Sequence, residues 1–262
     1  MAEATAGPLF ELRGVEKRFG AVHALRGVDF EVRAGEVVAL VGDNGAGKST
    51  LVGVMSGTVP CDAGRITFGG RAVALRAPQD ASALGVATVY QDLALCDELD
   101  IVANLFLGRE LGRPAGPLGR LDEVAMEVRA RELLDRLSVS VPSTRARVGG
   151  LSGGQRQSIA VARSMMGEPK VVLLDEPTAA LGVAQTRQVL DLIRRLRSQG
   201  LGVVVISHNL ADVFSVSDRI VVLRLGRRVA TFETKSARDV DVVGAITGAT
   251  EAGVALAGRG AA

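Results

Sequence analysis

The sequence predicts an α/β fold with a mostly parallel sheet, an antiparallel β layer near the N-terminus and a helical insert. Three observations support this prediction. Apolar runs of strand length occur at 37–41 and 171–174, as in parallel strands that are covered on both faces. Segments with helical spacing alternate with such strands, which favours right-handed βαβ connections. Residues 28–32 alternate apolar and polar side chains, which is typical of a half-buried strand.

Length and composition favour one domain with an attached subdomain. The chain has 262 residues, of which 47% are hydrophobic, so it can bury a sizeable core. A formal net charge of +2, one Tyr and no Trp give no support to a nucleic-acid surface. Cys61 and Cys96 indicate neither a disulfide framework nor a zinc site. With no signal-peptide pattern and no apolar run long enough to span a bilayer, the protein is expected to be soluble.

The first third of the chain mixes the two kinds of sheet. The strand at 37–41 leads into a glycine-rich loop, and a helix is expected to start near Ser49. Residues 66–68 and 71–73 flank Gly69-Gly70, which predicts a hairpin. A further strand over 85–90 ends at Gln91. The antiparallel layer and the beginning of the parallel sheet therefore both lie in this part.

The middle of the chain predicts a helical insert over 92–163. A Pro- and Gly-rich loop is expected at 112–119. After it, apolar residues recur at roughly helical spacing at Val124, Val128, Leu133 and Leu137. Tyr90 and Met165-Met166, at the borders of the insert, are interpreted as core residues.

The last third returns to alternating strands and helices. A helix is expected around 189–196 and is closed by Gly200. Strands are expected at 203–207 and 220–225. Arg194, Arg195 and Arg197 are interpreted as the solvated edge of the helix.

The strongest chemical signal is the glycine-rich loop between an apolar strand and a helix. It runs Gly42, Asp43, Asn44, Gly45, Ala46, Gly47, Lys48, Ser49, Thr50. Its glycine, lysine and serine spacing is that of a phosphate-binding P-loop. Glycines let backbone N–H groups face an anion, and the helix directs its positive end there. Lys48 adds charge for β- and γ-phosphates, and the Ser49 hydroxyl can bind Mg²⁺. The loop therefore predicts a P-loop NTPase core.

Two carboxylates follow the apolar strand at 171–174. Asp175 and Glu176 would lie at the edge of the parallel sheet where ligands bind. Asp175 is a candidate Mg²⁺ ligand through water, and Glu176 a candidate to polarise an attacking water. A pair of solvated acids at a strand end is the alternative interpretation.

A Ser-Gly-Gly segment precedes another expected helix. It comprises Leu151, Ser152, Gly153, Gly154 and Gln155. Ser152 is a plausible N-cap, and free backbone donors at a helix start would form an anion site. Considered by itself, this pattern favours a simple Ser-Gly-Gly turn.

The chain resembles an ATP-binding cassette (ABC) ATPase over roughly residues 8–250. The 42–50 loop resembles its Walker A motif and residues 171–176 its Walker B motif. Residues 151–155 resemble the signature motif, which is highly specific to this family. The resemblance implies one ABC ATPase domain over 1–250, with a nucleotide-binding core at 1–91 and 164–250. Residues 92–163 would be the helical signature subdomain, and 251–262 a flexible tail.

The resemblance also implies roles for single residues. Gln91 and His208 stand where the family has its Q-loop glutamine and switch histidine, and Phe19 where an aromatic residue stacks on adenine. ATP would be bound by Phe19, Gly42, Asn44, Gly45, Ala46, Gly47, Lys48, Ser49 and Thr50. Mg²⁺ would be held by Ser49, Gln91 and Asp175, and catalysis would use Glu176, His208 and Gln91. Phe19 as a core aromatic, Gln91 as a solvated amide and His208 as a strand-end cap remain alternatives.

In this family two cassettes close head to tail on two ATP molecules. The signature residues Leu151, Ser152, Gly153, Gly154 and Gln155 would then act in trans, in a homodimer. One departure is Gly182, which replaces the D-loop Asp that contributes to contacts between subunits. Because Glu176 and His208 are both present, an active ATPase is expected.

The segments 87–95, 103–110 and 207–214 resemble ATPases of bacterial monosaccharide importers for ribose, xylose or fructose. That resemblance implies a transmembrane permease as direct partner, docked beside Gln91 and residues 92–107, and an external solute-binding protein as indirect partner. The protein would be cytoplasmic and peripheral on the inner face of the membrane, with no nucleic-acid partner. A soluble ABC ATPase acting on ribosomes or DNA, or an importer subunit for another solute, is the alternative.

Overall fold

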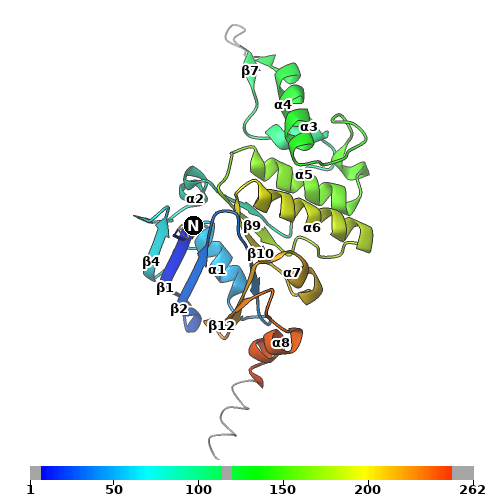
Figure 1. The fold of residues 1–262 in the computed structure, drawn as a ribbon. Helices are drawn as coiled ribbons and strands as arrows, with labels where there is room; N and C mark the ends of the chain where they lie inside the picture. The colour runs from blue at the N-terminus through cyan, green and yellow to red at the C-terminus, as the bar shows by residue number, and fades with distance from the viewer. Residues whose placement is uncertain (1–6, 114–119, 250–262) are drawn as a thin grey trace, which may run out of the picture.

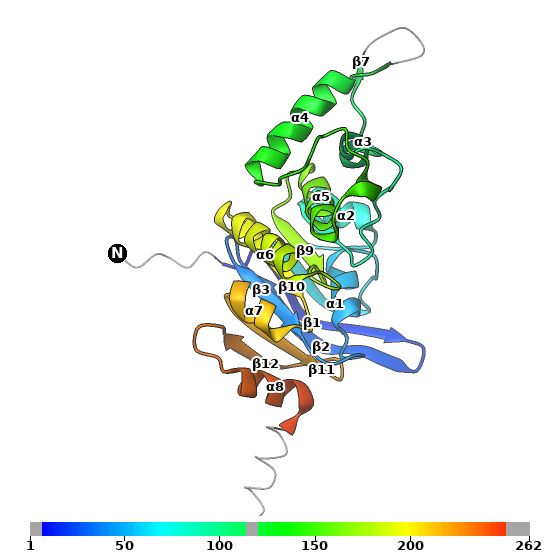
Figure 2. The same ribbon diagram turned by 90° about the vertical axis from the view of Figure 1, so that its right-hand side faces the viewer.

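The computed structural model describes residues 7–113 and 120–249, and the following statements concern that part of the chain. An antiparallel sheet and a larger, mostly parallel sheet lie side by side, with helices packed around them (Figure 1). The helices α3, α4 and α5 lie toward one end of the molecule and α8 toward the other (Figures 1 and 2). The predicted α/β class is confirmed.

The antiparallel sheet has the strand order β2-β1-β4-β5. Its strands are β1 (Phe10–Phe19), β2 (Val22–Val32), β4 (Ala63–Phe68) and β5 (Arg71–Val73). Strands β4 and β5 pair from Ile66↔Val73 to Phe68↔Arg71, which confirms the predicted hairpin. Strand β1 buries alternate apolar side chains, so one face of this sheet packs on the core.

The larger sheet has the order β12-β11-β3-β10-β9-β6. Its parallel strands are β3 (Val37–Val41), β6 (Val86–Val89), β9 (Val171–Asp175), β10 (Gly202–Ile206) and β11 (Arg219–Arg224). All five residues of β3 are buried, as its apolar run predicts. The edge strand β12 (Arg227–Glu233) is antiparallel to β11 and was not predicted. It contains three charged residues, and such a polar strand lacks the signal of a buried one.

Helices α1 (Lys48–Met55), α2 (Pro78–Leu84), α7 (Leu210–Val216) and α8 (Asp239–Thr247) accompany the sheets. Helix α6 (Val183–Ser198) buries Val189, Leu192, Ile193 and Leu196, as the spacing predicts. None of the helices among the described residues combines the length and hydropathy that a bilayer-spanning segment requires.

The segment between β6 and β9 contains α3 (Ile101–Phe106), α4 (Glu123–Arg136) and α5 (Gly153–Met165). Short strands β7 (Gly112–Arg113) and β8 (Arg120–Leu121) pair at the ends of the predicted loop. Residues 114–119 of that loop lie outside the described residues, as does the predicted tail at 251–262. Helix α5 ends at Met165, beyond the expected limit of the insert at 163.

The apolar stripe predicted for α4 is wrong at its first two positions. Val124 and Val128 are 66% and 49% exposed, whereas Leu133 and Leu137 are buried. Helix α4 instead buries Met126, Ala130, Leu133 and Leu134. The two valines fit the predicted stripe because they lie four residues apart. The buried face is set by contact with α3, which the sequence does not show.

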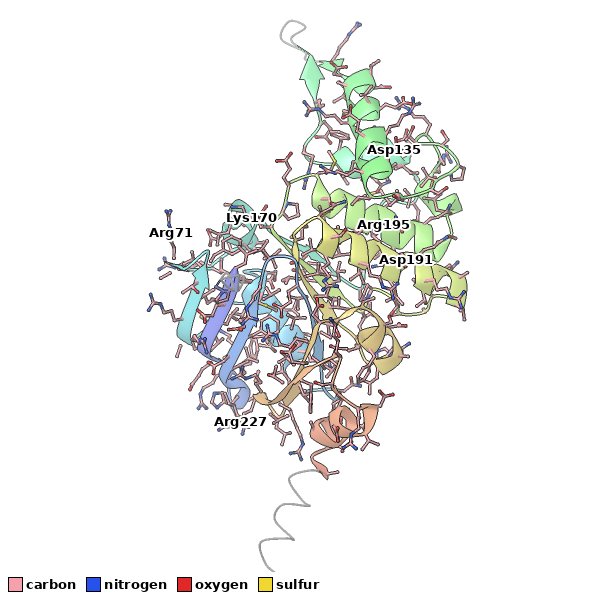
Figure 3. All side chains as sticks on the ribbon, viewed as in Figure 1. Arg71, Asp135, Lys170, Asp191, Arg195 and Arg227 are labelled. Carbon is pink, nitrogen blue, oxygen red and sulfur yellow. The ribbon has the colours of Figure 1, made fainter. Side chains whose placement is uncertain are left out.

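The arginines of α6 are not a merely solvated edge. Arg195 donates to the carbonyl oxygens of Leu137, at 2.6 Å, and Ser138, at 3.1 Å (Figure 3). It thereby joins α6 to the end of α4. Arg197 pairs with Asp218 at 2.6 Å, next to the start of β11, and Arg194 pairs with Asp191.

These packing differences predict how two substitutions in α4 affect stability. Leu133→Ala should lower the free energy of unfolding by about 2–4 kcal/mol, because Leu133 is 5% exposed and its loss leaves a cavity. Val124→Ala should change it by less than about 0.5 kcal/mol. Urea unfolding followed by circular dichroism measures both values. Equal losses in the two variants would contradict the observed helix orientation.

Candidate nucleotide site

The glycine-rich loop follows β3 and ends where α1 begins at Lys48. Gly42 has φ 153°, and a Cβ there would lie 2.3 Å from the Leu223 carbonyl oxygen. Gly47 has φ 103°, and a Cβ there would lie 2.8 Å from the Ala24 carbonyl oxygen. Both positions therefore require glycine, for conformation and for space.

Lys48 follows the last glycine of the loop, and its side chain turns back toward the loop backbone. Its Nζ donates to the carbonyl oxygens of Gly42, at 2.7 Å, and Asp43, at 3.0 Å. The ammonium group is thus held at the center of the curled backbone. An anion that enters the loop would meet this charge together with the N-terminal N–H groups of α1, which makes the loop an anion site.

A cavity of about 540 Å³ opens beside the loop. Its walls are residues Phe19, Ala21, Val22, His23, Ala24, Arg26, Asn44 to Thr50, Leu225 and Gly226. The side chain of Phe19 is 50% exposed, so its interpretation as a core aromatic is wrong. The structure brings Phe19 and the loop together in one cavity, although the two are far apart in the sequence.

Two acids and a histidine meet at the ends of β9 and β10. Asp175 is the last residue of β9, and His208 follows β10. His208 Nδ1 lies 2.9 Å from Glu176 Oε2. Glu176 has φ 49°, and its N–H donates to the Ile206 carbonyl oxygen at 2.9 Å, so its backbone is tied to β10. The Glu176 side chain is only 16% exposed and contacts His208, so a pair of solvated acids does not describe this strand end.

The charges at this edge interact. Burial raises the pKa of the Asp175 carboxyl, the adjacent Glu176 charge raises it further, and Lys48 lowers it in part. Burial disfavours the charged form of a carboxylate, so a cation bound nearby would restore it. Asp175 is thus suited to a site that receives positive charge together with its ligand.

The residues present fit Mg²⁺ only together with a phosphate ligand. No cluster of three or more His, Cys, Asp or Glu side chains suited to a metal occurs among the described residues. The hydroxyl of Ser49 and the carboxylate of Asp175 are hard oxygen donors, as Mg²⁺ prefers. Two such donors leave most of an octahedral shell to phosphate oxygens and water, which is typical of nucleotide-bound Mg²⁺.

Gln91 lies at the same edge of the sheet. Strands β6 and β9 are parallel, with Val89 opposite Leu174, so Gln91 follows β6 at the edge where Asp175 ends β9. The residue is exposed.

The Ser-Gly-Gly segment forms the start of α5. Ser152 is its N-cap: the Oγ accepts from the N–H of Gln155 at 3.3 Å, and the N–H of Ser152 donates to Gln155 Oε1 at 3.0 Å. A Cβ at Gly154 would lie 2.9 Å from the Cβ of Gln185 in α6, so this glycine permits close packing. Gly154 is buried and Ser152 is exposed, and no signature residue lines the cavity beside the P-loop.

Gly182 stands at the N-cap of α6. Its N–H donates to Gln185 Oε1 at 3.2 Å, but it has no side chain to cap the helix. Aspartate at this position would supply such a cap.

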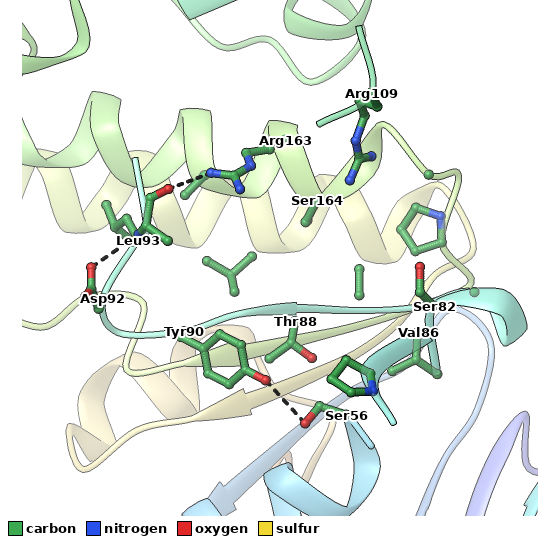
Figure 4. A pocket seen from close by; sticks show the side chains of 18 residues that line it. Ser56, Ser82, Val86, Thr88, Tyr90, Asp92, Leu93, Arg109, Arg163 and Ser164 are labelled. Atoms are coloured by element: carbon green, nitrogen blue, oxygen red, sulfur yellow. Dashed lines mark hydrogen bonds between the residues drawn. The ribbon is translucent and has the colours of Figure 1, made fainter. Parts of the chain in front are cut away.

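A second cavity, of about 370 Å³, was not predicted from the sequence (Figure 4). It lies between β6 and α5 and is lined in part by Tyr90, Leu93, Arg109 and Arg163. Tyr90 is 42% exposed, so its interpretation as core is wrong, and its hydroxyl donates to Ser56 Oγ at 3.3 Å. Arg163 Nη1 donates to the Ala94 carbonyl oxygen at 2.6 Å, which ties the segment after Gln91 to α5.

Comparisons with known proteins agree with this geometry. A fructose import ATP-binding protein of Rhizobium meliloti is 46% identical over 93% of this chain and 95% of the relative. A xylose/arabinose import ATP-binding protein of Sulfolobus acidocaldarius is 48% identical over 84% of this chain and 86% of the relative. A solved ATP-binding cassette of an ABC transporter matches with a TM-score of 0.79 and 27% identity, over 91% of this chain and 98% of the other.

The family profile described as ABC transporter matches residues 25–179, more than half of the chain. That stretch contains the P-loop, the Ser-Gly-Gly segment and both carboxylates. The motifs, the cavity that the P-loop lines and the similarity over nearly the whole length agree, and the chain belongs to the ABC transporter ATP-binding family.

Proposed function

We propose that this ABC ATPase is the motor subunit of a monosaccharide importer, and that it works as a head-to-tail homodimer on a separate membrane permease. The observation that carries the catalytic part is the 2.9 Å contact between His208 and Glu176, at the sheet edge that also presents the P-loop. The similarity to fructose and xylose/arabinose import proteins supports the substrate class.

The proposed reaction is hydrolysis of the terminal phosphate of ATP. Glu176 accepts a proton from water as the water oxygen attacks the γ-phosphorus, and the bond to the bridging oxygen breaks. Lys48 and the loop N–H groups stabilise the negative charge, and His208 contacts the γ-phosphate. Ser49, Asp175 and Gln91 would hold Mg²⁺, which neutralises phosphate charge when bound. The adenine ring of ATP is proposed to stack on Phe19.

The signature segment supports the dimer. An exposed Ser152 at the N-terminus of α5 offers an anion site, yet it lines no part of the P-loop cavity of its own chain. We infer that Ser152 and Gly154 of one subunit act on the ATP bound to the other. Gly182 would weaken contacts between the subunits without removing a hydrolytic residue.

The cavity beside Tyr90 supports a permease contact. Apolar side chains such as Leu93 line it, and Arg109 projects into it (Figure 4). A helix from the permease that docks here would touch the segment immediately after Gln91. We infer that this contact transmits nucleotide-dependent movement, with the subunit bound at the inner membrane face.

Glu176→Gln should keep ATP binding and lower kcat by at least about 100-fold, because the amide cannot accept the proton. Phosphate release from purified protein measures kcat, and size exclusion in ATP should reveal a trapped dimer. Glu132→Gln, at an exposed position of α4, is the matched control. Turnover that survives in Glu176→Gln would exclude this residue as the base.

Lys48→Ala should weaken ATP binding by about tenfold or more, since it removes a charged hydrogen-bond donor from the loop. Calorimetric titration measures the dissociation constant. Lys235→Ala removes an exposed lysine outside the cavity and should leave binding unchanged. Equal effects of the two substitutions would contradict the proposed phosphate site.

Arg109→Glu should reduce recovery of the permease about tenfold when tagged protein is purified from membranes in mild detergent, because a charge is reversed inside the docking cavity. Arg129→Glu makes the same reversal at an exposed position of α4 and should retain the permease. Uptake of labelled fructose, xylose and ribose should fall in parallel. Full recovery and uptake with Arg109→Glu would place the docking surface elsewhere.

A further inference from the structure

We propose that Lys17 is a positioning residue for the base: its ammonium group lies over the Phe19 ring and holds that ring at the mouth of the P-loop cavity. Lys17 Nζ is 5.4 Å from the centroid of the ring. The inference rests on the proposed role of this cavity in nucleotide binding. It adds a residue that neither the motif spacing nor the family resemblance singles out.

Lys17 is held in place by Asp62. The lysine is only 9% exposed, and its Nζ donates to Asp62 Oδ1 at 2.8 Å. The other oxygen, Oδ2, accepts from the backbone N–H of Arg18 at 2.7 Å. Both hydrogen bonds lower the pKa of the Asp62 carboxyl, and the bond from Lys17 has the larger effect. One carboxylate therefore fixes both the lysine and the backbone that leads to Phe19.

The strand geometry puts Lys17 and Phe19 on the same side. They are two residues apart on β1, and the 5.4 Å distance from Lys17 Nζ to the ring centroid shows that the two side chains share one side of the strand. Phe19 is the last residue of the strand and lines the cavity, whereas Lys17 does not line it. The cation therefore lies near the ring without lining the cavity, and the part of the ring exposed to the cavity stays available for a base.

The physical effect has two parts. A cation near an aromatic ring is attracted to its electron-rich face, which restricts a side chain that is otherwise half exposed. Stacking between a base and an aromatic side chain depends on a well-placed ring. With its position restricted before the nucleotide arrives, Phe19 loses less side-chain entropy on binding.

The test separates this role from simple attraction of phosphate by a positive charge. Calorimetric titration with MgADP and with Mg-pyrophosphate compares a ligand that has a base with one that lacks it, and neither is hydrolysed by this reaction. The variants are Lys17→Met, Lys17→Arg, Phe19→Leu and the double variant Lys17→Met/Phe19→Leu. Lys235→Met removes a lysine outside the cavity and serves as the matched control.

We expect Lys17→Met to weaken ADP binding about threefold to tenfold and pyrophosphate binding by less than about twofold. Lys17→Arg should restore ADP binding, because it keeps a cation over the ring. In the Phe19→Leu background, Lys17→Met should cause no further loss, since no ring remains to be positioned. Lys235→Met should bind both ligands as the wild type does.

The inference would be overturned, while the proposed function stands, by equal weakening of ADP and pyrophosphate binding in Lys17→Met, or by the same loss with and without Phe19. Unchanged ADP binding in Lys17→Met while Phe19→Leu weakens it would do so as well. If Phe19→Leu does not weaken ADP binding, the proposed placement of the adenine ring is wrong, and this inference fails with it. Thermal unfolding of each variant shows whether a loss reflects a damaged fold.

Discussion

The candidate site depends on a close approach of backbones that only glycine permits. The Ala24 carbonyl oxygen of β2 would lie 2.8 Å from a Cβ at Gly47 and 2.6 Å from one at Gly226. The N–H of Gly226 donates to the Ala46 carbonyl oxygen at 3.0 Å, and its own carbonyl oxygen accepts from Arg26 at 2.8 Å. This contact holds the antiparallel sheet against the P-loop. Without it, Phe19 and Lys48 would not line the same cavity.

The parallel sheet gathers the remaining chemical groups. Strands β3, β9 and β10 are neighbours, so the P-loop, the Asp175-Glu176 pair and His208 emerge at one edge. Hydrogen bonds between strands satisfy the backbone polar groups of the sheet, and the loops beyond it carry the reactive side chains. The contact between Glu176 and His208, at 2.9 Å, shows that the loops after β9 and β10 meet. The proposed catalytic role therefore rests on their placement as well as on residue type.

The helices α3, α4 and α5 add surfaces that are not part of this edge. The signature segment starts α5, and close packing at Gly154 against Gln185 connects it to α6 and to the segment around Gly182. The cavity beside Tyr90 lies between β6 and α5, and the Arg163–Ala94 hydrogen bond ties the segment after Gln91 to α5. Helix α5 therefore contacts both the segment after Gln91 and the start of α6. Such an arrangement suits a protein that converts ligand binding into movement.

The sequence by itself determined the strands of the parallel sheet, the P-loop and the carboxylates after β9. Apolar runs and glycine spacing are local signals, and the chemistry of the P-loop requires those residues in that order. The sequence did not determine which face of α4 is buried, that Tyr90 is exposed, or that β12 adds an antiparallel edge. Nor did it reveal that the Lys17 ammonium group lies over the Phe19 ring, or that residues of β6 and α5 line a common cavity. These features depend on contacts between segments far apart in the chain, such as Lys17 with Asp62, and only tertiary packing decides which of the possible contacts form.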